Sequence, residues 1–334
     1  MCGYWLASGY SADKGNDLLL LSMDNYGSLE IKTGLRIGRN PSFLCPGEDG
    51  VYAAQEYDSG ASVLFIKGDG GRLYIDSQIS IDGCSGLCHL LASRETVVGC
   101  CYGSGDVFAA DAALTKVLWM HRNASDSQAQ PHAHWSAEVY TGFPERREAL
   151  QGAEKTLCVA DLGLDMLLWR RAADGELLGS TAIEAGSGPR QVILSESRKS
   201  AYIIGELNST VSILDISGTP NVISELRTTE RGITNYPGAA CLSSSGVLYV
   251  ANRGADTIAA IDVNTAEPHV LFESGCGGSW PRWITLSEKE DYLICCNQKS
   301  GNVTSLRITK NSLVACSSAA LANASCAVAA GHIV

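Results

Sequence analysis

The apolar positions of this chain fall into short runs of five to seven residues rather than into long helical stretches. The clearest succession occupies residues 188–194, 200–206 and 209–214, each rich in Val, Ile, Leu or Tyr. Gly, Asn and Ser separate the runs, so the pattern predicts three short antiparallel strands joined by tight turns. Long stretches with a 3.6-residue apolar period, which would predict helices, do not occur.

The same succession recurs along the chain with related residues at corresponding positions. Six copies pair a first run with a second: residues 40–44 with 51–56, 88–90 with 97–102, 131–134 with 157–161, 188–194 with 200–206, 236–237 with 247–253, and 280–282 with 292–298. The third copy carries an insertion within residues 125–154 that aligns poorly with the others. A repeat of this length indicates an array of small sheets.

A seventh copy is divided between the two ends of the repeat. Residues 4–9 and 18–21 look like second and third strands without a first, and residues 324–329 have the length of the missing strand. They follow residues 312–316, which are expected to form an outer strand. Their pairing would close a ring and remove open sheet edges. We therefore predict an all-β, seven-bladed β-propeller, one domain over residues 1–334, in which N- and C-terminal strands share one blade. A β-sandwich or a pair of smaller all-β domains is the structural alternative, but either leaves the repeat unexplained.

Charge and composition exclude several classes of function. With 36 acidic against 25 basic residues and a formal net charge of −11, the chain lacks the basic face that nucleic acids require. Residues 313–334 are too weakly apolar to predict a membrane span, and the first residues do not form a secretory signal. The 13 Cys show no CxxC spacing and are expected as buried thiols in a reducing cytoplasm rather than as a disulfide framework.

Propeller geometry groups the chemically active residues at one mouth of the central channel. The start of a blade's first strand and the end of its second lie side by side because the two strands are antiparallel. The residues that this rule collects are Glu56, His89, Tyr102, His132, His134, Asp161, Arg190, Glu206, Arg253, Arg282 and Gln298. Three Arg and up to three His converging in an acidic chain predict a site for a phosphate or carboxylate ligand.

Within this group, Glu206 beside Arg190 is a candidate general base, because a guanidinium keeps a carboxylate ionised. His134 is the competing candidate. The structural alternative is that Arg190 bonds neighbouring carbonyls and that Glu206 is only its ion-pair partner. A metal site is not expected, because the carboxylates lie among cations, and no nucleotide-binding or serine-hydrolase motif predicts a cofactor or a serine nucleophile.

Several of these motifs resemble those of the 6-phosphogluconolactonase family of seven-bladed propellers. They are Gly186-Ser187-Gly188-Pro189-Arg190, Gly205-Glu206-Leu207-Asn208-Ser209-Thr210-Val211, Pro131-His132-Ala133-His134, Cys101-Tyr102-Gly103-Ser104-Gly105, Asn252-Arg253-Gly254 and Trp280-Pro281-Arg282. They occur in the family's order and cover nearly the whole chain. Two positions depart from the family pattern: Gln191 stands where a His is frequent, and Gly205 where an Asn commonly precedes the Glu.

The resemblance implies hydrolysis of 6-phosphogluconolactone, a small anionic lactone of the pentose phosphate pathway, without a cofactor. It implies Glu206, His134 and Arg190 as catalytic candidates and Arg253 as a substrate-binding candidate. The predicted position at the mouth adds four further substrate-binding candidates: Arg282, His132, His89 and Tyr102. Two alternatives stay open: cycloisomerisation of a carboxymuconate, which the same family performs, and ligand or protein binding without catalysis. The oligomeric state is not predicted.

Overall fold

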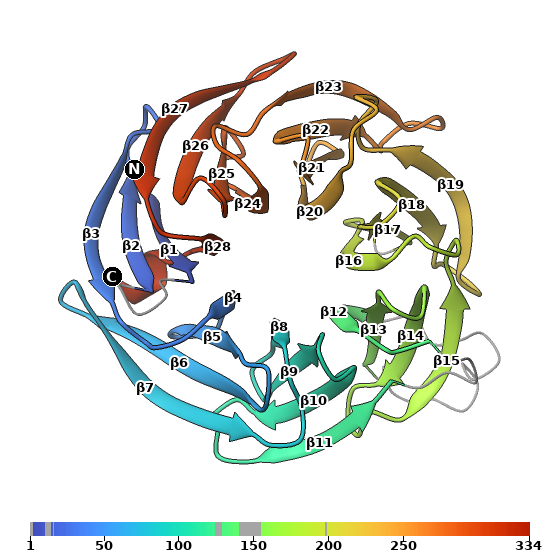
Figure 1. Ribbon diagram of the computed structural model, residues 1–334, viewed down its shortest axis with the longest axis horizontal. Helices are drawn as coiled ribbons and strands as arrows, with labels where there is room; N and C mark the ends of the chain where they lie inside the picture. The colour runs from blue at the N-terminus through green and yellow to red at the C-terminus, as the bar shows by residue number, and fades with distance from the viewer. Residues whose placement is uncertain (1–2, 11–14, 16, 124–128, 140–154, 198) are drawn as a thin grey trace.

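Seven four-stranded antiparallel sheets stand around a central axis in the computed structural model, as Figure 1 shows. The structure describes residues 3–10, 15, 17–123, 129–139, 155–197 and 199–334. The predicted seven-bladed propeller is therefore confirmed.

The innermost strands of the blades are β4 (Pro41–Pro46), β8 (Leu87–Ala92), β12 (Ala133–Val139), β16 (Pro189–Leu194), β20 (Tyr236–Leu242), β24 (Pro281–Leu286) and β28 (Ala324–Ala329). The second strands are β5 (Val51–Glu56), β9 (Thr96–Cys101), β13 (Thr156–Asp161), β17 (Ser200–Gly205), β21 (Val247–Arg253), β25 (Tyr292–Asn297) and β1 (Gly3–Gly9). The third strands are β6 (Ala61–Asp69), β10 (Asp106–Asp111), β14 (Met166–Arg171), β18 (Thr210–Asp215), β22 (Thr257–Asp262), β26 (Asn302–Ile308) and β2 (Leu18–Met23).

Each blade also has a fourth, outer strand, which the sequence pattern predicted only for residues 312–316. The outer strands are β7 (Arg72–Ile81), β11 (Val117–Arg122), β15 (Leu177–Ala182), β19 (Asn221–Arg227), β23 (His269–Gly275), β27 (Leu313–Ala320) and β3 (Leu29–Leu35). Strand β19, for example, has no fully buried residue. A short 3₁₀ turn, η2 (Gly331–Ile333), follows β28.

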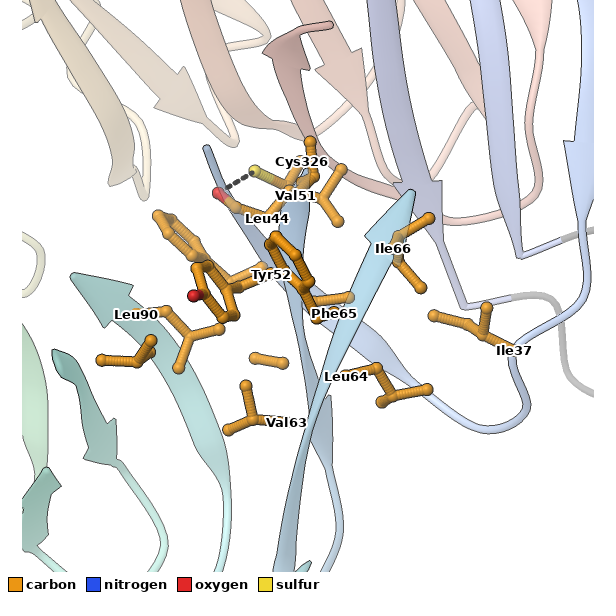
Figure 2. Packing of buried hydrophobic residues seen from close by; sticks show 14 of the residues in the cluster. Ile37, Leu44, Val51, Tyr52, Val63, Leu64, Phe65, Ile66, Leu90 and Cys326 are labelled. Atoms are coloured by element: carbon orange, nitrogen blue, oxygen red, sulfur yellow. Dashed lines mark hydrogen bonds between the residues drawn. The ribbon is translucent and has the colours of Figure 1, made fainter. Parts of the chain in front are cut away.

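The core lies between neighbouring blades, and Figure 2 shows one part of it. On β6, Val63 and Phe65 point towards one side of their sheet, whereas Leu64 and Ile66 point towards the other. All four are buried. Since the middle strands of a blade are covered on both faces, they read as continuous apolar runs instead of an alternation.

The ring closes through β28, which pairs with β1 from the opposite end of the repeat. Ser8 lies opposite Cys326 in this antiparallel register, and the hydroxyls of Ser8 and Ser325 are 2.9 Å apart. The sheet order β28-β1-β2-β3 is the blade that residues 324–329 were predicted to complete. Cys326 also reaches the next blade, where its thiol contacts the Leu44 carbonyl at 3.8 Å.

Twelve cysteines lie in the described part of the chain, and none of them forms a disulfide. Most are buried, as expected for small strand residues. Within the same residues, no helix has the length and apolar character needed to cross a membrane.

Candidate functional site

A bulge near the start of every innermost strand forms the wall of the central channel. In β16, Pro189 pairs with Gly205 and Gln191 pairs with Ile204, so Arg190 is a bulge residue that has no partner on β17. The corresponding shift occurs in all seven blades and brings one side chain or backbone segment of each to the axis. These residues line a small cavity of about 20 Å³: Ser42, Cys88, His134, Arg190, Ala239, Arg282 and Ser325.

A second ring of side chains lies where the second strands end, above this wall. The backbone N–H of Glu206 donates to the Gly188 carbonyl at 2.9 Å, which fixes Glu206 beside the entrance of β16. The residues at the equivalent place in the seven blades are Tyr10, Glu56, Tyr102, Leu162, Glu206, Arg253 and Gln298. The expected proximity of Arg190 and Glu206 is therefore present, and it follows from strand register.

Glu206 stands at the centre of a cluster with Arg190, Arg253 and His134. Its Oε2 accepts from Arg190 Nη1 at 2.6 Å and lies 3.0 Å from Arg253 Nη2. Arg190 Nη1 also lies 2.7 Å from His134 Nε2. The structure thus brings together the three residues expected to be catalytic and one of those expected to bind substrate.

Backbone carbonyls hold the two guanidinium groups in place. Arg190 Nε donates to the Gly238 carbonyl at 3.1 Å, and Arg253 donates to the Tyr236 and Pro237 carbonyls at 2.9 and 3.1 Å. Glycine is required at position 238 because a Cβ there would come within 2.7 Å of the Pro281 oxygen. Both interpretations of these Arg therefore apply together: they bond carbonyls of the inner strand, and they present the remaining N–H groups to Glu206.

The charges of the cluster set its protonation. Burial opposes ionisation of Glu206, but Arg190 and Arg253 outweigh it and lower its pKa to about 2. Burial and the neighbouring Arg190 lower the pKa of His134 well below its usual value. The imidazole is therefore neutral at physiological pH, and its Nε2 accepts the hydrogen bond from Arg190.

This protonation pattern separates the two candidates for the general base. The only basic lone pair of neutral His134 is engaged by Arg190, and its buried Nδ1 has no partner among the described residues. Glu206 is ionised, and no described residue hydrogen-bonds to its Oε1. Of the two, Glu206 has the free acceptor atom that a water molecule needs.

A second polar cluster stands across the channel, on the blades of β24, β1 and β5. Arg282 Nη2 donates to the Tyr10 hydroxyl at 3.0 Å, and this hydroxyl donates to Glu56 Oε2 at 2.7 Å. The Arg282 guanidinium carbon lies 5.4 Å from the centre of the Tyr10 ring. Sequence reasoning included Arg282 and Glu56 at the mouth but missed Tyr10. The available signal was position, because Tyr10 follows Gly9 at the end of a second strand as Glu206 follows Gly205.

Tyr102 and His132 lie at the outer edge of the mouth. Their rings stack with centroids 4.5 Å apart, and Tyr102 meets His134 edge-on at 5.7 Å.

Asp161 was expected among the residues at the mouth, but the structure gives it a different position. Its carboxylate is buried and accepts from the backbone N–H of His132, Gly163 and Leu164, so it holds the turn after β13 together.

The structure does not place His89 at the mouth. The bulge in β8 turns Cys88 towards the channel and His89 away from it, since Leu87 pairs with Cys101 and His89 with Cys100. The buried His89 ring accepts from the Ser136 N–H at 3.2 Å, and burial lowers its pKa to about 3. Gln191 makes the equivalent bridge in its own blade, through both its amide atoms to Ala240. Gln191, which stands where the family frequently has a His, thus makes a contact between two blades.

Aromatic side chains form the floor beneath the polar rings. Phe43 meets Trp135 and Trp283 edge-on, with ring centroids 5.5 and 5.1 Å apart, and the two indoles lie 6.0 Å from one another. The His89 ring lies 3.8 Å from Trp135, with the two ring planes tilted by 31°. Trp283 Nε1 donates to the Ala327 carbonyl at 2.8 Å, which ties the floor to β28. Phe43 and the two indoles therefore line the small central cavity.

The described residues contain no group of three or more His, Cys, Asp or Glu side chains that could hold a metal ion. The polar atoms at the mouth are instead guanidinium donors, two carboxylates and a phenol. Such a set of groups is chemically suited to hold an anion and to exchange protons with it.

Comparison with known proteins agrees with this arrangement. The family model described as "Lactonase, 7-bladed beta-propeller" matches residues 4–326. A 6-phosphogluconolactonase of Bacillus subtilis (strain 168) is 26% identical over 299 residues, which are 82% of this chain and 81% of that protein. A protein from Lactobacillus plantarum has the same fold, with a TM-score of 0.84, 21% identity, and coverage of 98% of this chain and 99% of its own. The periplasmic gluconolactonase PpgL of Pseudomonas aeruginosa also has this fold, with a TM-score of 0.81, 19% identity and 99% coverage of both chains. The chain belongs to the seven-bladed β-propeller lactonase family.

Proposed function

We propose that this protein hydrolyses a small anionic sugar lactone, 6-phosphogluconolactone or a close relative, at the mouth described above. The observation that carries the proposal is the Glu206 carboxylate, which two Arg residues keep ionised while its Oε1 stays available. A general base needs an ionised, accessible oxygen next to the position of the water.

The charge balance of the mouth supports an anionic substrate. Arg190, Arg253 and Arg282 contribute three positive charges, whereas Glu206 and Glu56 contribute two negative ones. The neutral His134 leaves this excess unchanged. A bound phosphate would be attracted by the remaining guanidinium N–H groups, and a lactone carbonyl placed on one of them would be polarised for attack.

In the proposed reaction, Glu206 takes a proton from a water molecule as that water attacks the lactone carbonyl carbon. Arg190 and Arg253 stabilise the negative charge that develops on the carbonyl oxygen, and Arg282 binds the anionic group of the substrate. The aromatic floor keeps the substrate near the mouth. His134 positions Arg190 through its Nε2.

A lactonase assay tests the proposal directly. Acid release from 6-phosphogluconolactone and from gluconolactone is followed with a pH indicator, and the spontaneous rate is subtracted. We expect hydrolysis above the spontaneous rate, with a preference for the phosphorylated substrate. Glu206→Gln should lower turnover by ~10² to 10⁴, whereas the exposed Glu30→Gln should leave it unchanged. Binding of either lactone without turnover would refute the proposed hydrolysis and favour a binding propeller.

We also propose that the protein works in the cytoplasm and serves the pentose phosphate pathway. The twelve unpaired cysteines of the described residues support a reducing compartment. The alternative is a periplasmic location, as for the gluconolactonase of Pseudomonas aeruginosa. Fractionation of cells that produce the tagged protein would distinguish the two compartments.

A further inference from the structure

The cluster of Tyr10, Glu56 and Arg282 has no role in the water activation described above. All three side chains come from adjoining blades, and Tyr10 is fixed by backbone and side-chain bonds to the turn before β28. Its N–H donates to the Asn323 carbonyl at 3.2 Å, and Asn323 Nδ2 donates to the Tyr10 carbonyl at 3.0 Å. Ring closure therefore positions the phenol.

This cluster and the Glu206 cluster face the same channel. Arg282 lines the central cavity together with His134 and Arg190, and it contacts the Tyr10 hydroxyl directly. Tyr10 and Glu206 occupy equivalent positions in two blades that stand across the ring from one another, as Figure 1 shows for β1 and β17. A lactone between them would have one face towards Glu206 and another towards the phenol.

We propose that Tyr10 is the general acid of the reaction and donates its phenolic proton to the ring oxygen of the lactone as the bond from that oxygen to the carbonyl carbon breaks. The inference rests on the proposed lactonase function and assigns it a second proton-transferring residue. Hydrolysis of an ester needs such a donor when the leaving group is an alkoxide, because an unprotonated alkoxide leaves poorly.

Over one catalytic cycle, the protons taken up and released by Glu206 and Tyr10 balance. Water adds its oxygen to the carbonyl carbon, and Glu206 receives one of its protons. When the tetrahedral intermediate collapses, the electrons of the broken C–O bond go to the ring oxygen, which takes the proton of Tyr10. The phenolate keeps the hydrogen bond from Arg282, and the proton on Glu206 returns to Tyr10 through solvent. One water is consumed, and a hydroxy acid is formed.

The contacts of Tyr10 suit this role. Arg282 donates to the phenol oxygen, which is the atom that becomes negative, and so stabilises the phenolate when it forms. In the resting state, the phenolic O–H donates a hydrogen bond to Glu56, which therefore orients the proton. Burial raises the pKa of Tyr10, which brings it closer to that of a sugar alkoxide and keeps the proton on the phenol until the leaving group needs it.

The test compares two leaving groups in the Tyr10→Phe variant, which keeps the ring beneath Arg282 and loses only the hydroxyl. The probes are 6-phosphogluconolactone, which releases an alkoxide, and dihydrocoumarin, which releases a phenolate that needs no protonation. We expect kcat on the sugar lactone to fall by ~10² to 10⁴ and kcat on dihydrocoumarin to change little. Tyr26→Phe, at a side chain that is 85% exposed, is the matched control.

An equal loss on both substrates, or no loss on the sugar lactone, would overturn the assignment. If the wild-type protein hydrolyses only the sugar lactone, 3-fluorotyrosine at position 10 decides the question. The more acidic phenol should then change kcat on the sugar lactone at constant pH, because the rate of proton donation depends on the pKa of the donor. An unchanged kcat would refute the acid role. If the wild-type protein hydrolyses no lactone at all, the proposed function itself fails, which is a separate result from a failure of Tyr10.

Discussion

Replacement of Glu206 by Gln should lower the stability of the fold as well as its activity. The amide resembles a protonated carboxyl group, so the variant loses the interactions that depend on the negative charge. The pKa of Glu206 falls from 4.5 to about 2 on folding, because Arg190 and Arg253 outweigh the opposing effect of burial. At ~1.4 kcal/mol per pKa unit, the ionised carboxylate stabilises the native state by about 3 kcal/mol at pH 7. The side chain is only 17% exposed, so solvent screens little of this contribution.

The sign of the pH dependence follows from the direction of the shift. Since the folded pKa is depressed, the unfolded chain binds the proton more readily between pH 4.5 and pH 2. The stabilisation by Glu206 is thus complete above pH 4.5 and declines as the pH falls, with about 2 kcal/mol lost by pH 3. The difference between wild type and Glu206→Gln should therefore shrink from about 3 kcal/mol at pH 7 to about 1 kcal/mol at pH 3.

Urea unfolding followed by tryptophan fluorescence measures this difference, because Trp135 and Trp283 lie in the floor beneath the cluster. Glu30→Gln breaks an ion pair whose carboxylate is 70% exposed, and it should change the free energy of unfolding by less than about 1 kcal/mol. A Glu206→Gln protein as stable as wild type at pH 7 would refute the electrostatic reasoning. So would a difference that stays constant down to pH 3.

Three further predictions concern residues that shape the site. His89→Gln should be tolerated at pH 7, since Gln191 makes the same bridge with an amide. Burial lowers the pKa of His89 to about 3, so the wild-type protein loses up to ~5 kcal/mol of stability as the pH falls from 6.5 through 3. The Gln variant should lack this acid sensitivity. Acid unfolding curves that coincide for the two proteins would contradict this. Gly86 directly precedes β8, and its carbonyl accepts from the backbone N–H of Tyr102 at 2.7 Å. Gly86→Ala should cost ~1 to 3 kcal/mol, because φ is +67° there and the new Cβ would lie 2.5 Å from the Gly103 nitrogen. Gly218→Ala, whose new Cβ meets nothing within 4 Å, is the control in thermal melts. Trp283→Phe removes the hydrogen bond to Ala327 and should cost ~1 to 3 kcal/mol, and urea midpoints no lower than wild type would contradict it.

The strands were predictable to the extent that both of their faces are buried. The apolar runs of β17 and β18 are covered by neighbouring blades, so hydrophobicity alone outlines them. The outer strand β19 has only exposed and half-buried residues, and its apolar residues Val222, Ile223 and Leu226 do not form one continuous run. Its place in the sheet depends on backbone pairing with β18, which leaves little trace in composition.

The sequence predicted the candidate site correctly where the strand register could be read from a hairpin. It misplaced a residue where a bulge shifts the register by one position. Arg190 and Glu206 were expected together because the two strands share a hairpin, and they are. His89 was misplaced because the bulge in β8 gives the channel position to Cys88, and a shift of one residue moves a side chain to the other face. Tyr10 was missed because its blade is assembled from two distant segments, so no hairpin in the sequence indicates which residues it meets.

The blade that joins β28 to β1 also sets the order in which function can arise during synthesis. Ser8 and Cys326 are paired across nearly the whole chain, and bringing such distant segments together costs ~5 kcal/mol of chain entropy, by a (3/2)RT ln n estimate. A nascent chain that has reached β27 already contains Glu206, Arg190 and Arg282, yet the turn that holds Tyr10 has not been made. Until then, β1 presents an unpaired edge of the kind that invites association with other chains. Completion of the ring therefore ends a period of aggregation risk and, in the same step, positions Tyr10.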